Sequence, residues 1–222
     1  MPLNKSKGNM YPFVSHTWNV IKGKCPHDCS YCYMKRYPQP ELHFDEKELK
    51  TNLGSGNFIF VGSSCDMWAD VIPTEQINTI LAHCSNFSNI YIFQSKNPQR
   101  FTRLFPYQPS WFPINTTLGT TIESNRTYGS ITGGQIPWRR MMSMRSLSCA
   151  CYVSIEPIMD FDLDVMVDWM QEIKPVFVSI GADSGNNHLP EPSPDKVKAL
   201  IEGLKEFTEV KVKDNLKRLL NA

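Results

Sequence analysis

Three cysteines in one short segment, Cys25, Cys29 and Cys32, have side chains and a spacing that could hold an iron–sulfur cluster. Three residues separate the first two cysteines, two separate the second pair, and an aromatic residue, Tyr31, precedes the last. A 4Fe–4S cluster that only carries electrons is ordinarily held by four cysteines. Three thiolates would leave the fourth iron without a protein ligand, so the segment predicts a cluster that can bind another molecule.

Two other interpretations of this segment stay open from the residues alone. His27 could be the fourth ligand of a zinc ion, although structural zinc sites usually combine two separated groups of ligands. Alternatively, two of the cysteines could form a disulfide and leave the third as a free thiol. Because short motifs also occur by chance, the cluster is a hypothesis that the surrounding elements must support.

The cysteine segment resembles the signature of the radical S-adenosylmethionine (radical SAM) superfamily. In that superfamily, SAM binds the open iron through its amino and carboxylate groups, and the reduced cluster cleaves SAM to a 5′-deoxyadenosyl radical. The cofactors carry the chemistry, and the protein positions and shields them. The resemblance implies that Cys25, Cys29 and Cys32 bind irons and that Tyr31 lies near the adenine of SAM.

The composition is ordinary for a soluble globular protein. The 222 residues suffice for one domain with a proper core, and 23 basic residues nearly balance 22 acidic ones. This balance gives no case for strong nonspecific binding to nucleic acid. We find neither an apolar run of membrane-helix length nor a hydrophobic signal region, and we expect no membrane partner. Seven cysteines, an odd number with three clustered, favour a reducing, cytoplasmic location.

Short β-rich runs alternate with helical patterns along the chain, which predicts parallel strands joined by helical crossovers. The predicted strands are 16–20, 57–62, 89–94, 115–121, 149–155, 176–180 and 210–213, and the predicted helices are 30–37, one that begins at 73, 163–173 and 195–207. Six or seven parallel strands indicate an α/β fold, a partial (β/α)6 TIM-like barrel of the radical SAM type, in one domain spanning 1–222. Active sites of such barrels lie at the carboxyl ends of the strands.

The loop after the second predicted strand is the first candidate to bind SAM. Gly62, Ser63 and Ser64 are similar in position and size to the superfamily motif that accepts hydrogen bonds from the amino group of SAM, although a simple glycine turn is the alternative. The same loop continues with Cys65 and Asp66, which we assign to catalysis. A buried structural cysteine is the alternative role for Cys65.

The ends of the next two strands also carry polar residues that we assign to cofactor binding. Lys96 could meet a carboxylate or a phosphate, although a solvated lysine is the default expectation. Thr121 and Glu123 combine a hydroxyl and a carboxylate, which suits the ribose of SAM. A helix N-cap formed by Ser124 or Asn125 is the alternative explanation of this polar run.

Charged residues follow the last three strands as well. We assign Glu156 and Asp183 to cofactor binding and Lys213 to catalysis, at the rim where a substrate would be positioned. The best basic cluster of the sequence, formed by Arg139, Arg140 and Arg145, is predicted to be a solvated helix face rather than a phosphate site. Cys149 and Cys151 alternate onto one face of a strand and are predicted to be core residues.

Four later motifs sharpen the resemblance. Residues 61–66, 118–123, 154–157 and 181–185 resemble a family of short radical SAM proteins encoded by phages and their hosts, the phage Gp37/Gp68-like proteins. The resemblance runs from about Thr17 to the end of the chain. In that family the last strand ends in a lysine, for which Lys213 is the counterpart. Ala182 and Asp183 depart from the family's Gly-Gly-Glu pattern, which puts the role of Asp183 in doubt.

The resemblance also implies a substrate class. Some phage members of the family are implicated in hypermodified thymidine in DNA. A more distant resemblance is to spore photoproduct lyase, a radical SAM enzyme that repairs a thymine dimer and keeps a cysteine hydrogen donor beyond its second strand, where this chain has Cys65.

We therefore expect a radical SAM enzyme that abstracts hydrogen from a thymine-derived base in DNA, which would have to be flipped out of a duplex. Its partners would be SAM, the DNA substrate and an electron donor such as flavodoxin or ferredoxin. The alternatives are radical modification of a peptide, a tRNA or a small metabolite, and an iron–sulfur sensing protein without turnover.

Overall fold

The centre of the structure is a sheet whose strands follow one another in chain order. The computed structural model describes residues 3–8, 10–104, 112–129 and 131–221. Within these residues the main sheet has eight strands, in the order β1-β2-β5-β6-β7-β8-β9-β10. The short β1 (Asn4–Lys5) is antiparallel to β2 (His16–Trp18). From β2 onward neighbouring strands are parallel, through β5 (Phe58–Val61), β6 (Ile90–Ser95), β7 (Thr116–Thr121), β8 (Cys151–Ile155), β9 (Phe177–Ile180) and β10 (Glu209–Val212).

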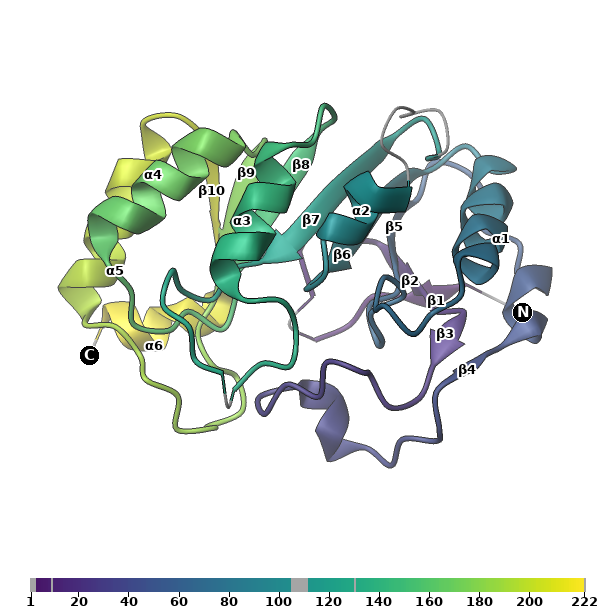
Figure 1. Cartoon of the computed structure of the whole chain (residues 1–222), viewed down its shortest axis with the longest axis horizontal. Coiled ribbons are helices and arrows are strands. Elements are labelled where there is room, and N and C mark those ends of the chain that lie inside the picture. Colours follow the sequence, from purple (N-terminus) through teal and green to yellow (C-terminus); the bar gives the residue numbers. More distant parts are fainter. Residues whose placement is uncertain (1–2, 9, 105–111, 130, 222) are drawn as a thin grey trace.

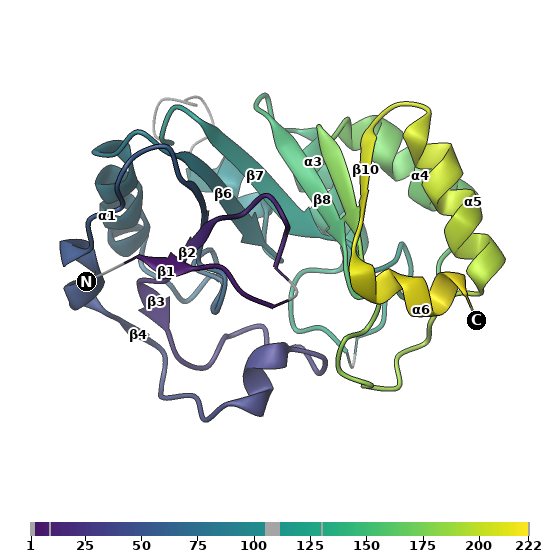
Figure 2. The same ribbon diagram turned by 180° about the vertical axis from the view of Figure 1, so that it is seen from behind.

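The sheet is curved and open, as Figure 1 and Figure 2 show from opposite sides. Each crossover from β5 to β10 steps to the next position in the same direction, which is the winding of a (β/α) barrel. The edge formed by β1 and β2 does not pair with β10, so the barrel is partial. The predicted α/β fold with a partial parallel barrel is confirmed.

Helices follow the parallel strands and cover the convex face of the sheet (Figure 1). They are α1 (Thr74–Ser85), α2 (Gln99–Leu104), α3 (Pro137–Arg145), α4 (Leu163–Ile173) and α5 (Pro194–Lys205), with a short α6 (Lys217–Leu220) near the carboxyl end. In α4 the residues Met166, Trp169, Met170 and Ile173 recur at helical spacing and are all buried. No helix of the described part is long and apolar enough to span a bilayer.

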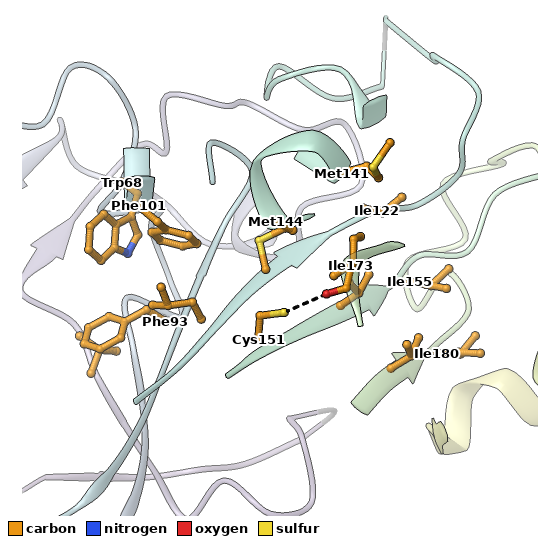
Figure 3. Close-up of a cluster of buried hydrophobic side chains, with 14 of the residues drawn as sticks. Trp68, Phe93, Phe101, Ile122, Met141, Met144, Cys151, Ile155, Ile173 and Ile180 are labelled. Carbon is orange, nitrogen blue, oxygen red and sulfur yellow. Dashed lines mark hydrogen bonds between the residues drawn. The ribbon is translucent and has the colours of Figure 1, made fainter. Parts of the chain in front are cut away.

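The main core lies between this helical layer and the sheet. Figure 3 shows part of it, with Trp68 and Phe101 near α2 and the sulfur of Cys151 pointing to the end of α4. The Trp68 and Phe101 rings meet edge to face at 4.8 Å. The thiol of Cys151 donates to the carbonyl of Ile173 over 3.8 Å, and Cys149 packs against the same core. Both cysteines are therefore core residues, as predicted.

The concave face carries a second, aromatic cluster that the sequence analysis did not anticipate. Residues 10–14 of the amino-terminal segment lie there, and Figure 2 shows this segment passing in front of the sheet. Tyr11 packs edge to face on Tyr152 at 6.0 Å, and Phe13 contacts Phe177 at 5.2 Å. The segment thus fills the space that further strands would enclose in a closed barrel.

Three local differences from the predicted elements concern the region before β5. The first strand ends at Trp18 rather than at residue 20, because Asn19 turns away to bind a neighbouring loop. The predicted helix 30–37 is only a 3-10 turn, η1 (Tyr33–Arg36), since the cysteine loop occupies its beginning. A hairpin of β3 (Ile21–Lys22) and β4 (His43–Phe44), followed by the 3-10 turn η2 (Glu46–Lys50), was not predicted. A further 3-10 turn, η4 (Asp214–Leu216), follows β10.

Gly119 of β7 is a position where the concave face tolerates no side chain. An added Cβ would lie 2.2 Å from ring carbons of Tyr152. We expect Gly119→Ala to lower the free energy of unfolding by about 1–3 kcal/mol in urea titrations, because the ring would have to move. Gly129→Ala is the matched control, since its added Cβ would meet nothing within 4 Å. Equal free energies of unfolding for the two variants would contradict the close packing of Tyr152 against Gly119.

Candidate active site

The cysteine loop lies at the carboxyl-end edge of the sheet and is held there by the loop that follows β7. The backbone N–H of Ser30 donates to the carbonyl of Ile131 at 2.8 Å, and that of Gly133 donates to the carbonyl of His27 at 2.9 Å. A Cβ on Gly133 would lie 2.0 Å from the His27 oxygen, so only glycine permits this approach. The two loops therefore form one unit.

The three thiols of this loop fit the donor set of an iron–sulfur cluster. All three are free, with Cys29 buried and Cys25 and Cys32 half-buried. Burial raises the pKa of Cys32, and the charges of Cys29 and Cys25 raise it further. The sulfur of Cys29 also lies 3.4 Å from the hydroxyl of Thr132. Soft thiolates of this kind are the usual ligands of such clusters.

The two alternative interpretations of the loop find no support in its geometry. All seven cysteines are free thiols, which excludes a disulfide in this structure. Within the described residues, no three His, Cys, Asp or Glu side chains converge as a single metal ion requires. The imidazole of His27 is bonded to Asp66 at 2.7 Å.

Asp66 holds the cysteine loop to the sheet. Its Oδ2 accepts from His27 Nε2 at 2.7 Å, from Ser95 Oγ at 2.8 Å and from the backbone N–H of Lys96 at 2.9 Å. Its Oδ1 accepts from the backbone N–H of Trp68 at 2.9 Å. Burial alone raises the pKa of Asp66, but its bonds, led by His27, outweigh this and lower it. Asp66 thus positions the cysteine loop, and its predicted catalytic role stays a prediction.

The candidate SAM loop after β5 has the backbone that its sequence suggested. Gly62 has a φ of +80°, in the left-handed region that favours glycine. Asn19 Oδ1 accepts from the backbone N–H of Ser64 at 3.0 Å and from the hydroxyl of Ser63 at 3.3 Å. The phenol of Tyr33 donates to the carbonyl of Ser63 at 3.2 Å. Asn19 was missed by the sequence analysis, since one asparagine after a strand carries no signal by itself.

Cys65 lies against one of the candidate cluster ligands. It is buried and lies close to Cys25. Its contact with Cys65 lowers the pKa of Cys25, and the same contact, followed by burial, raises the pKa of Cys65 above its ordinary range. A buried thiol therefore lies beside one of the candidate cluster ligands.

Glu123, after β7, is the centre of a buried ionic network. Its Oε2 accepts from Arg140 Nη1 at 2.7 Å, and its Oε1 accepts from Lys96 Nζ and from the phenol of Tyr31. Lys96 Nζ also lies 2.5 Å from the Tyr31 oxygen. Burial on its own raises the pKa of Glu123, but the charges of Arg140 and Lys96 outweigh it and lower the pKa to about 2. The predicted site residues Tyr31, Lys96 and Glu123 are thus brought together.

Arg140 corrects the prediction of a solvated arginine cluster. Its side chain is completely buried, because α3 packs over β7 and turns this arginine inward to Glu123 and to the carbonyl of Thr121. Its Nε and Nη2 find no acceptor within the described residues. Arg139 and Arg145 are exposed, as predicted. Two cations, Arg140 and Lys96, therefore bind one carboxylate, which leaves this buried site with an excess of positive charge.

Thr121 belongs to the concave interior rather than to the ionic network. Its hydroxyl accepts from Gln94 Nε2 at 2.8 Å. The Oε1 of Gln94 accepts in turn from the phenols of Tyr11 at 2.7 Å and Tyr152 at 2.9 Å. These side chains form one hydrogen-bonded layer across the concave face. Tyr11 and Gln94 could not be linked from sequence, because the segment with Tyr11 meets β6 only in the folded structure.

Two of the remaining candidates pair with each other. Lys213, at the end of β10, donates to Glu156 Oε2 at 2.8 Å, and Asn215 donates to the other oxygen of Glu156 at 3.2 Å. Lys213 Nζ also lies 4.9 Å from the centre of the Tyr11 ring. The ends of β8 and β10 thus present a mostly buried ion pair beside the concave face.

Asp183 shapes its own loop. Its carboxylate accepts from the backbone N–H of Gly185 at 2.9 Å, from the backbone N–H of Asn187 at 2.5 Å and from Asn187 Nδ2 at 2.6 Å. These bonds are those of an aspartate that closes a turn. Asp183 thus has a structural role in its loop, and its predicted role in cofactor binding stays a prediction.

Comparison with known proteins finds similarity in structure and none in sequence. No protein-family model matches the sequence, and no curated protein matches it. The chain is similar to spore photoproduct lyase complexed with dinucleoside spore photoproduct, at a TM-score of 0.66 and 9% identity over 92% of this chain and 78% of that one. It is also similar to Streptococcus suis SuiB bound to S-adenosylmethionine, at 0.58 and 10% over 91% of this chain and 50% of that one.

The chain has the fold of these proteins. A mutant of the lyase with bound AdoMet and dinucleoside spore photoproduct aligns over 95% of this chain and 80% of the other, with a TM-score of 0.64. The fold and the cysteine loop are therefore the two features from which a function can be inferred.

The buried network gives a test of the role of Arg140. We expect Arg140→Met to lower the free energy of unfolding by about 3–5 kcal/mol at pH 7, because it removes the fully buried cation from a buried carboxylate. Arg139→Met, on the same helix but exposed, should change stability by no more than about 0.5 kcal/mol in the same urea titrations.

The loss of stability in Arg140→Met should depend on pH. The folded-state pKa of Glu123 is lowered from 4.5 to about 2, so the stability that it contributes is present above pH 4.5 and is lost as the pH falls towards 2. The difference between the wild type and Arg140→Met should therefore shrink across this window. A difference that stays constant between pH 5 and about pH 2 would show that Glu123 is not the partner that matters.

Proposed function

We propose that this protein is a radical SAM enzyme that uses a 4Fe–4S cluster and SAM. The observation that carries this proposal is the loop of three free thiols at the carboxyl-end edge of an open, sequentially wound parallel sheet. Its support is the fold shared with spore photoproduct lyase and with SuiB, which was solved with S-adenosylmethionine. When bound, the reduced cluster and SAM would supply a 5′-deoxyadenosyl radical that takes a hydrogen atom from the substrate.

The residues of the chain would hold these cofactors as follows. Cys25, Cys29 and Cys32 would bind three irons, in a loop that Asp66 and Gly133 fix to the sheet. The backbone of the loop 62–64, kept in place by Asn19, would accept from the amino group of SAM. Tyr31 would lie near the adenine. The positions of the cluster and of SAM would thus depend on hydrogen bonds between residues of the protein.

The network around Glu123 suits the carboxylate of SAM. Two cations face a single protein carboxylate there, so a second carboxylate would complete the balance of charge. Lys96 is the cation that reaches towards the cysteine loop, since it also contacts Tyr31. Thr121 and Glu123 would be the residues nearest to the ribose. Arg140, fully buried behind Glu123, would hold this carboxylate in position.

The concave face would shield the radical and position the substrate. Its aromatic side chains exclude water from the interior, which a primary carbon radical requires. The ion pair of Lys213 and Glu156 offers a donor and an acceptor at the rim of this surface. A polar substrate group could exchange with either partner, so Lys213 keeps the catalytic assignment and Glu156 a binding one.

For the substrate we propose a thymine-derived base in DNA. The support is the similarity to a lyase solved with dinucleoside spore photoproduct, together with the buried thiol of Cys65 close to Cys25. Such a thiol can return a hydrogen atom to a substrate radical. A base within a duplex would have to be flipped out to reach it. A peptide is the second candidate, because SuiB was also solved with its precursor peptide, although this chain covers only 49% of that protein.

An electron donor of the flavodoxin or ferredoxin kind would reduce the cluster. Free cysteines throughout the described chain fit a reducing compartment such as the cytoplasm. The proposal thus includes a carrier protein that must approach the cysteine loop from outside.

The cofactor chemistry can be tested by electron paramagnetic resonance. We expect anaerobically reconstituted, reduced protein to give a cluster signal that shifts when SAM is added, and to form 5′-deoxyadenosine. Cys29→Ala should lose both the signal and the product, because it removes a cluster ligand. Cys84→Ala, which changes a buried cysteine of α1, is the matched control and should keep both. An unchanged signal in Cys29→Ala would refute the assigned ligand set.

The substrate can be tested by the yield of 5′-deoxyadenosine. We expect a duplex oligonucleotide that contains spore photoproduct or another modified thymine to raise this yield, and an unmodified duplex to leave it at the basal level. Cys65→Ala should still form 5′-deoxyadenosine but yield less of the repaired or rearranged base, because the hydrogen donor is missing. Equal yields with every DNA would argue against the proposed substrate and favour a peptide.

A further inference from the structure

Helices α2 and α3 lie side by side on the convex face and share an unusual charge pattern (Figure 1). Their sequences, QRFTRL and PWRRMMSMR, contain arginines and no Asp or Glu. The whole chain has a formal net charge of only +1. Basic charge is therefore concentrated on this pair of helices, whereas the rest of the molecule is close to neutral or acidic.

Two of these arginines are directed outward without an ionic partner. Arg100 and Arg140 point inward, to backbone carbonyls and to Glu123. Arg145 pairs with Glu172 at 2.6 Å at the carboxyl end of α3. Arg103 and Arg139 are exposed, and neither makes an ion pair within the described residues. The exposed part of the α2–α3 face thus carries two uncompensated positive charges.

A groove runs between the two helices and has two apolar side chains, Trp138 and Met142, in a mainly polar lining. It is lined by Gln99, Thr102, Trp138, Arg139, Met142, Ser143 and Ser146. Trp138 is 52% exposed and the neighbouring Ile136 is 44% exposed, so the two form a small apolar patch beside Arg139. Tryptophan and arginine are the residues most enriched at the energetic centres of protein interfaces. We name the surface formed by these residues and Arg103 the α2–α3 face.

The amino-terminal end of the α2–α3 face is connected directly to the cysteine loop. The side chain of Gln135 donates to Gln99 Oε1 at 3.0 Å, and its backbone N–H donates to the carbonyl of Lys96 at 3.1 Å. Two residues earlier, Gly133 donates to His27 within the cysteine loop. A short series of hydrogen bonds therefore links this face to the cysteine loop that carries the three thiols.

We propose that the α2–α3 face docks an acidic one-electron carrier protein, of the flavodoxin or ferredoxin kind, which reduces the cluster. This inference rests on the proposed function, because a cluster that cleaves SAM must first receive an electron from outside the chain. The carrier is oxidised by one electron and the cluster is reduced by one, with no bond made or broken. Complementary charge steers such encounters and sets their rate.

The observations favour a carrier protein over nucleic acid. Only two unpaired arginines flank the apolar side chains of Trp138, Ile136 and Met142, whereas a DNA surface is more polar and carries many phosphate contacts. The face also lies on the convex side, opposite the aromatic concave surface where a base would be bound. A donor on one side and a substrate on the other could bind at the same time.

The first test measures binding and needs no cluster. Oxidised flavodoxin and a plant-type ferredoxin are titrated by calorimetry into the wild type, Arg139→Glu, Trp138→Ala and Lys198→Glu. Lys198→Glu makes the same change of charge on α5, away from the face, where its ion pair with Asp195 is long at 3.9 Å. We expect Arg139→Glu and Trp138→Ala to weaken binding of at least one carrier about tenfold and Lys198→Glu to have no effect. Binding by the wild type should also weaken as salt is added.

The second test measures electron transfer in the reconstituted holoprotein. Reduced flavodoxin should reduce the cluster of Arg139→Glu about tenfold more slowly than that of the wild type, whereas the small reductant dithionite should act equally on both. Three results would each overturn the inference. They are no binding of either carrier to the wild type, equal binding of a carrier by all four proteins, and loss of duplex DNA binding instead of carrier binding in Arg139→Glu. A failure to assemble any cluster would defeat the proposed function alone, because the binding test would still decide the docking face.

Discussion

The ionised carboxylate of Glu123 is the point on which the candidate site depends. It lies at the end of β7 and receives Arg140 from α3, Lys96 from the end of β6 and Tyr31 from the cysteine loop. A buried carboxylate is unfavourable unless it is paired and hydrogen-bonded, and here both conditions are met. One side chain thus fixes the relative positions of a strand end, a crossover helix and the irregular loop with the thiols.

Asp66, like Glu123, holds the cysteine loop to the ends of the strands, on the other side of that loop. Its bonds to His27, Ser95 and the backbone of Lys96 join the loop after β5 to the cysteine loop and to the end of β6. The cysteine segment has almost no regular secondary structure, so these two carboxylates replace the ladder of hydrogen bonds that would hold a strand or a helix. The irregular backbone of the cysteine segment is held by these charged groups, which cannot move without losing their hydrogen-bond partners.

Much of this architecture could be predicted from the sequence. Each parallel strand is a short apolar run followed by polar residues, and these local signals gave the sheet, the site edge and the three thiols. The role of Arg140 could not be predicted, since its position in an arginine-rich stretch says nothing about which residue α3 turns inward. The same holds for Asn19 and for the two aspartates, whose partners are distant in sequence. Residues 10–14 carry no periodic pattern, and their burial depends on a surface that exists only after the sheet has formed.

That aromatic segment has a consequence for the order of folding. Phe13 and Tyr11 are synthesised well before Tyr152 and Phe177, on which they pack. Contacts between residues so distant in sequence form slowly, because a long loop must close before they contribute. Residues 10–14 should therefore dock last, after β8 and β9 have joined the sheet. Until then the concave surface stays open to water, so the half-barrel is completed by a segment that precedes its first parallel strand.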